Sequence, residues 1–168
     1  MYLSISEFVE DWNRESGNSL KVERMLTDAS LSQKGDAESN SLGKIAWHMV
    51  VMIGLTAAGA GLTVDAPPRG TEPPATAAAI ADAYERAARS LAEQASARLK
   101  DDQMGTEITL FGRTMKLAAA LQGLIRHQIH HRGQMTILMR SAGLTVPGVY
   151  GPSREEAAAM RAKQAQGR

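Results

Sequence analysis

Four long segments of this chain have the periodicity of an α-helix, and the residues between them break helices. In the first segment, residues 4–28, apolar side chains recur at spacings of three and four, which places them on one helix face. The other segments are expected at residues 41–60, 75–100 and 114–141, the last opened by Thr114. Since strand patterns are almost absent, the sequence predicts an all-α fold, a four-helix bundle with long connections and a short C-terminal helix.

The connections between these helices are long for a helical bundle. Residues 65–74 contain four prolines and a glycine, so this segment must be extended. In a further connection, residues 101–113, Ile108, Leu110 and Phe111 could form a short extended piece. Because tight helical hairpins need only about two to eight residues, we expect at least one connection to cross the bundle.

Size and composition fit one folded domain over residues 1–168, with 43% hydrophobic residues. Ser153 followed by Glu156 has the spacing of a capping box, which predicts the start of the short last helix. A net charge of +1 gives no electrostatic reason to expect nucleic acid as a partner. The absence of cysteine excludes disulfides and thiolate ligands, and it fits a cytoplasmic protein.

Residues 45–64 form an uncharged stretch of 20 residues, long enough to span a bilayer. The second half of the stretch consists largely of Ala, Gly and Thr, which are weakly apolar, and the sequence has no second stretch like it. The N-terminus also lacks the basic and apolar regions of a signal peptide. We therefore expect a buried bundle helix and no membrane partner.

The segment at 114–141 is apolar on two faces. One face carries residues such as Leu121 and Leu124, and the opposite face carries Ile125 and Met139. A helix of this kind is either central or buried by another subunit, and we expect a homodimer.

Three of the four histidines, His127, His130 and His131, fall within five residues. His127 and His131 are spaced i, i+4, the spacing with which one helix offers two imidazoles to a single metal ion. His48, in the apolar segment 45–64, could supply a third ligand from a neighbouring helix. Because His130 points about 100° away from His131, we expect it to flank the site.

The alternative is that the histidines are ordinary core residues, each bonded to a carbonyl or a carboxylate. Two imidazoles stacked on one inward face would be costly without a common ligand, however. Three neutral imidazoles bind zinc or a similar first-row ion and leave positions open for water or substrate. Gln128 follows His127 where the zinc-peptidase motif has glutamate, so that enzyme class is disfavoured.

Weaker candidates lie near the histidines in sequence. Arg132 could meet an anionic cosubstrate, although arginines on a helix are more often solvated or ion-paired. Gln134 could bond an imidazole or a metal-bound water, and is equally compatible with a plain surface position. Tyr150 is a candidate for contacting a substrate.

Two runs at the C-terminal end resemble a known family. The runs His127–Gln134 (HQIHHRGQ) and Ala142–Pro152 (AGLTVPGVYGP) are similar to the C-terminal signature of the DinB-like (YfiT-like) metalloprotein superfamily. The similarity extends back through Leu42–Met49 (LGKIAWHM) and the first helix, so it covers nearly the whole chain. It implies a bundle of unusual connectivity, often dimeric, with a divalent metal ion held by three histidines, here His48, His127 and His131.

The resemblance also implies a class of reaction. Relatives include S-transferases and an isomerase that use a low-molecular-weight thiol as cosubstrate. We expect a divalent ion, zinc or nickel, and S-transfer to a small-molecule substrate, with Arg132, Gln134 and Tyr150 as candidates for contacts near the site. The alternatives are metal-dependent hydrolysis by a bound hydroxide and a non-catalytic, stress-associated dimer that the metal stabilises.

Overall fold

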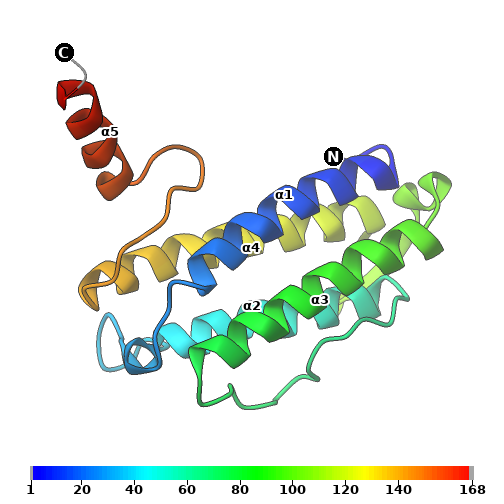
Figure 1. Ribbon diagram of the computed structural model, residues 1–168. Coiled ribbons are helices and arrows are strands. Elements are labelled where there is room, and N and C mark those ends of the chain that lie inside the picture. Colours follow the sequence, from blue (N-terminus) through cyan, green and yellow to red (C-terminus); the bar gives the residue numbers. More distant parts are fainter. Residues whose placement is uncertain (1, 167–168) are drawn as a thin grey trace.

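The computed structural model describes residues 2–166 and consists mainly of helices (Figure 1). The four long helices are α1 (Ile5–Glu23), α2 (Leu42–Gly59), α3 (Ala77–Arg98) and α4 (Leu117–Ser141). The smaller elements are the 3₁₀ helices η1 (Asp28–Ser32) and η2 (Asp101–Gly105), the strands β1 (Glu107–Leu110) and β2 (Arg113–Lys116), and the C-terminal helix α5 (Arg154–Gln166). The predicted all-α class is confirmed.

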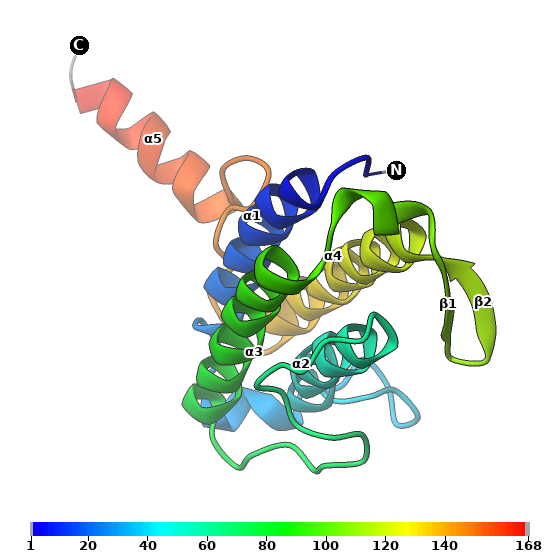
Figure 2. The ribbon, with the colours of Figure 1, turned by 90° about the vertical axis from the view of Figure 1, so that its right-hand side faces the viewer.

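The order of the helices around the bundle differs from their order in the chain. α1 packs against α3 and α4, and α2 packs against the same two helices. Consecutive helices α1 and α2 therefore lie diagonally opposite each other, as do α3 and α4 (Figure 2). The connections after α1 and after α3 cross the bundle, which is why both are long.

Local sequence explains where the elements begin and end. The predicted helix over 4–28 is too long, because α1 ends at Glu23. A capping box formed by Thr27 and Ser30 then starts the separate helix η1. The predicted start of the last long helix at Thr114 is also wrong. Thr114 pairs with Thr109 in the antiparallel β1–β2 hairpin, and α4 begins only at Leu117.

Other predicted boundaries agree with the structure within two residues. α2 and α3 lie inside the predicted ranges 41–60 and 75–100. The expected extended piece in 101–113 is the hairpin strand β1. The capping box of the last helix is present, since the Ser153 backbone N–H donates to the Glu156 carboxylate and the Glu156 N–H donates to Ser153 Oγ.

α2 is the one helix among residues 2–166 that is long and apolar enough to cross a bilayer, with a mean hydropathy of 1.4 over 18 residues. More than half of that helix is buried inside the protein, between α3 and α4. The core helix of a soluble bundle has the same length and composition. The structure thus accounts for the uncharged stretch without a membrane.

The two apolar faces of α4 are covered in large part within the single chain, with Ile129 and Thr136 of the second face half-buried. Ile125 and Met139, on the face that suggested a second subunit, are buried. α4 is therefore central, and the dimer stays a prediction. By contrast, α5 has no buried residue and projects away from the bundle (Figure 1), held near its start by the Arg140–Glu155 ion pair.

Glu23, at the C-terminal end of α1, is a buried carboxyl group without a partner. It is 1% exposed, and neither of its oxygens accepts a hydrogen bond from any residue in the range 2–166. Burial raises the pKa of Glu23 well above its usual value, since removal from water disfavours the charged form. Glu23 therefore lowers the free energy of unfolding at every pH at which its carboxyl group would be ionised in the unfolded chain.

We predict that Glu23→Gln stabilises the protein increasingly as the pH rises. The pKa of Glu23 is raised in the folded protein, so its contribution to the free energy of unfolding is most favourable below about pH 4.5. That contribution is lost as the pH rises toward the pKa of the folded state. In urea unfolding, the variant and the wild type should have nearly the same free energy of unfolding at pH 4. At pH 8 the free energy of unfolding of the variant should be higher by about 1–3 kcal/mol. An equal effect at both pH values would contradict the assignment.

Candidate metal centre

Three histidines from two helices converge at one point between α2 and α4. Nε2 of His127 lies 3.1 Å from Nε2 of His48 and 3.1 Å from Nε2 of His131. All three candidate ligand atoms lie within 4.8 Å of one another. The predicted convergence of a distant histidine with the i, i+4 pair is therefore present in the fold.

The two separations that involve His127 fit a shared first-row cation. Imidazole nitrogens bind zinc at about 2.0–2.1 Å, so two ligands at angles between octahedral and tetrahedral values lie about 2.8–3.4 Å apart. The two Nε2–Nε2 contacts of 3.1 Å fall inside that interval. The donor set of three uncharged imidazoles is one that zinc, nickel and similar ions accept.

Hydrogen bonding among the rings cannot account for both contacts. A ring nitrogen carries either one hydrogen or one lone pair, so Nε2 of His127 can form a linear hydrogen bond with only one of its two neighbours. Nδ1 of His131 lies 2.7 Å from Gln134 Oε1 and donates its hydrogen there, which leaves a lone pair on Nε2 of His131. A cation at the centre would instead bind one lone pair from each of the three Nε2 atoms.

Gln134 is thus placed to bond an imidazole, one of the roles that its sequence position allowed. By accepting from Nδ1 it fixes the tautomer and the orientation of His131. Hydrogen bonds of this kind to the far nitrogen of a ligand histidine are the usual support of metal sites.

Gln128 holds the two helices together beside the histidines. Its side chain is fully buried; the amide donates to the Met49 carbonyl at 3.0 Å and accepts from the Tyr84 hydroxyl at 3.1 Å. Met49 follows His48 and Gln128 follows His127 in the sequence. One amide therefore fixes α2 and α3 against α4 at the level of the imidazoles.

The surroundings keep the imidazoles uncharged. Burial, with the nearby His131, His48 and His130 rings, lowers the pKa of His127 from 6.5 to about 4. Burial also lowers the pKa values of His48 and His131. Because metal ions bind only the unprotonated ring, protons compete little for this site at neutral pH.

The centre opens into a cleft of about 1160 Å³ between α2, α4 and the extended segment 69–73. His48 is exposed, and His127 and His131 are half-buried. An ion on the three nitrogens would thus have a side accessible to solvent, which distinguishes catalytic from closed structural sites.

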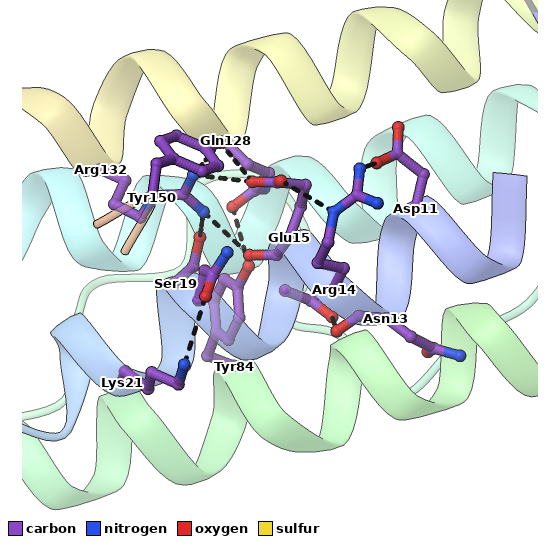
Figure 3. A network of polar contacts seen from close by, with 12 residues as sticks. Asp11, Asn13, Arg14, Glu15, Ser19, Lys21, Tyr84, Gln128, Arg132 and Tyr150 are labelled. Carbon is purple, nitrogen blue, oxygen red and sulfur yellow. Dashed lines mark hydrogen bonds and ion pairs between the residues drawn. The ribbon is translucent and has the colours of Figure 1, made fainter. Parts of the chain in front are cut away.

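Arg132 and Tyr150 do not join the histidines. Arg132 is buried on another face of α4, where it donates to the Glu15 carboxylate at 2.7 Å and to Ser19 Oγ at 3.1 Å (Figure 3). The Tyr150 hydroxyl bonds the same carboxylate at 2.6 Å. Burial alone would raise the pKa of Glu15, but hydrogen bonds from Tyr150 and Arg132 and the Arg132 charge hold it below its usual value. These contacts tie the segment after α4 to α1.

His130 lies outside the group of three. It is exposed, and its ring centre is 5.0 Å from that of His131. This is the flanking position that the sequence predicts for it.

Sequence reasoning did not assign the positioning role of Gln128 or the partner of Arg132. A signal for Gln128 was present, because an amide on an otherwise apolar inward stripe needs buried partners. Glu15 carried no comparable signal, since its position in α1 does not reveal a partner that lies 117 residues away.

Known proteins share this fold and much of the sequence. The model of the DinB family matches residues 1–166. The uncharacterized protein YrdA of Bacillus subtilis is 40% identical over 156 residues, which cover 93% of each chain. A crystal structure of a DinB-like protein from Bacillus cereus matches with a TM-score of 0.85 and 41% identity, over 89% of this chain and 100% of that one. YjoA, a DinB-like protein of Bacillus subtilis, has a TM-score of 0.67 and 21% identity over 85% of this chain and 97% of its own, a likeness of fold alone.

We predict that the metal-free protein loses stability as the pH falls from about 6.5 to about 4. In this interval the histidines of the unfolded chain bind protons, whereas those of the folded protein stay uncharged. The free energy of unfolding therefore decreases as the pH falls. After allowance for solvent screening, His127 should contribute about 1–2 kcal/mol to the loss.

Chemical unfolding in the presence of a chelator at several pH values would measure this slope. His127→Gln should flatten it, whereas His130→Gln, which changes an exposed ring outside the cluster, should leave it as in wild type. Identical slopes in all three proteins would contradict the interpretation.

Proposed function

The chain belongs to the DinB family, and on that basis we propose that it binds a divalent metal ion, zinc or nickel, and catalyses thiol-dependent S-transfer to a small molecule. The ligands in this proposal are His48, His127 and His131. The observation that carries it is the convergence of the three rings on the wall of an open cleft, where Nε2 of His127 lies 3.1 Å from Nε2 of each of the other two histidines.

The proposed chemistry follows from the donor set. His48, His127 and His131 would hold a divalent ion without neutralising its positive charge, and such an ion would supply a lowered pKa to the thiol of a cosubstrate. In the overall reaction a thiol sulfur forms a bond to an electrophilic carbon, the leaving group departs with its electron pair, and the thiol proton goes to solvent. The chain has no cysteine, so the sulfur comes from a cosubstrate.

The protein residues orient and shield the reacting groups. Gln134 fixes the ring of His131, and the Gln128 amide fixes the distance between α2 and α4. Val51 and Met52 line the cleft next to His48 and present apolar surface to a bound substrate. A low-molecular-weight thiol pool stays reduced in the cytoplasm, which is the compartment that we propose.

Hydrolysis by a metal-bound hydroxide is the second candidate. The cleft is open to water, and Glu72, on its wall, is a carboxylate that could accept a proton from an attacking water. Activity on an ester and amide panel without added thiol would favour hydrolysis over S-transfer.

We predict about one metal ion per chain by elemental analysis, and metal-dependent conjugation of a generic electrophile such as monochlorobimane with one or more cellular thiols. His48→Ala should lose at least 90% of both, because two remaining imidazoles hold a first-row ion weakly. The matched control is His130→Ala, which removes an exposed imidazole outside the cluster and should retain both.

Two results would contradict this prediction. One is full metal occupancy with no turnover for any thiol in the panel. The other is conjugation that persists undiminished in His48→Ala after metal removal.

A further inference from the structure

We infer that the cleft selects an elongated small molecule that carries both an anionic group and an apolar group, because two unpaired cations line the cleft before and beside the three histidines and the exposed Phe111 lines its far end. This inference rests on the proposed function, since it takes the histidines as the place where the sulfur is held. It adds the class of substrate, which the metal site alone leaves open.

One face of α2 sets the order of groups along the cleft. Lys44, His48, Met52 and Leu55 all line it, at helical spacings of four, four and three residues. With a rise of 1.5 Å per residue, Lys44 lies about 6 Å from His48 along the helix axis, and Leu55 lies about 10 Å from His48 in the other direction. A ligand that contacts both ends must therefore pass the histidines.

Two cations line the cleft, Lys44 before the histidines along α2 and Arg69 beside them. Lys44 and Arg69 line the cleft and are exposed, and neither forms an ion pair with a carboxylate anywhere in residues 2–166. Glu72 is the single carboxylate among the lining residues. Lys44 also stands in the first turn of α2, where the helix dipole disfavours a positive charge, so it does not serve helix stability.

Arg69 reaches this cleft because its segment is fixed on both sides. The Trp47 indole N–H donates to the Thr71 carbonyl at 2.7 Å. Earlier in the segment Ala66 packs on Gly54 so closely that a Cβ added there would lie 2.9 Å from the Ala66 Cβ. Arg69 lies between these two anchors, beside the turn of α2 that carries His48. Two unpaired cations next to a bound divalent ion give a positive potential that attracts an anion.

The apolar end carries a residue whose backbone is unfavourable for its type. Phe111 and Gly112 form the two-residue turn between β1 and β2, with φ values of +52° and +74°. A turn with both φ values positive favours Asn-Gly, and a bulky residue with positive φ is strained. Phe111 is nevertheless 56% exposed, and it lines the cleft.

Hairpin folding does not explain this phenylalanine, whereas a ligand contact does. The hairpin is held at the end of α2, where a Cβ added at Gly59 would lie 2.7 Å from Leu110 Cδ1. This packing keeps the turn beside the apolar end of the cleft. Phe111 is therefore the apolar contact of the proposed substrate, opposite Lys44.

Binding to the cobalt(II)-loaded protein tests the inference, because thiolate coordination gives a charge-transfer absorption that does not depend on turnover. The probes are 4-mercaptobutyrate, its uncharged amide, and the same acid with a hexyl chain on the sulfur-bearing carbon. We expect the acid to bind about tenfold tighter than the amide. This ratio of affinities corresponds to the binding free energy of one or two partly exposed ion pairs. The preference should weaken at high salt.

Lys44→Gln and Arg69→Gln together should abolish the preference and leave amide binding unchanged. Phe111→Asn should raise the melting temperature, because asparagine suits a turn with positive φ values. The same variant should reduce about fivefold the increase in binding affinity that the hexyl chain gives. The higher melting temperature shows that any loss of binding in this variant is not a folding defect.

A second arm locates the anionic group on the thiol or on the electrophile. Conjugation of an uncharged thiol is compared for 4-chloro-3-nitrobenzoate and its amide, in wild type and in the double glutamine variant. If the carboxylate preference that depends on Lys44 and Arg69 is found in thiol binding, the anionic group belongs to the thiol. If it is found instead in conjugation of the chloronitrobenzoate, the anionic group belongs to the electrophile.

The outcomes separate this inference from the proposed function. If acids and amides bind or react equally in both arms, the inference is overturned while thiol binding to the metal stands. A preference that persists in the double glutamine variant overturns the assignment to these two cations. Absence of a charge-transfer band with every thiol overturns both the inference and the proposed S-transfer.

Discussion

The buried amide of Gln128 is the contact on which the candidate metal centre depends. It joins α4 to the Met49 carbonyl of α2 and to the Tyr84 hydroxyl of α3, with no exposure to solvent. α2 and α4 are separated by a connection that crosses the bundle, so nothing local in the chain fixes their distance. Loss of the amide would leave buried polar groups unpaired and would release the spacing between His48 and His127.

α4 serves two different tasks on two faces. One face carries His127 and His131 toward α2 and the cleft, and the other carries Arg132 into the pocket formed by Glu15 and Tyr150. The buried ion pair holds the segment after α4 on α1, and the open face stays free for a ligand. The separation explains how adjacent residues, His131 and Arg132, belong independently to the candidate metal centre and to the packing of the fold.

Much of this could be predicted from the sequence, for a physical reason. Helical periodicity is local, so it located the four helices, and the i, i+4 spacing of His127 and His131 is local too. Partners distant in the chain were not predictable: the buried pairing of Arg132 with Glu15 depends on how α1 meets α4. The start of α4 was misplaced because the helix pattern runs smoothly into Arg113–Lys116, whereas pairing with β1 and the turn at Phe111 make those residues a strand.

The most direct measurement is the anomalous scattering of crystals of the zinc-loaded protein, recorded on both sides of the zinc absorption edge. The account predicts one anomalous peak per chain, about 2.0–2.2 Å from the Nε2 atoms of His48, His127 and His131, with a further position facing the cleft and filled by water or a small ligand. A metal ion bound by only two of these histidines, or one closed off by a fourth protein ligand, would contradict it.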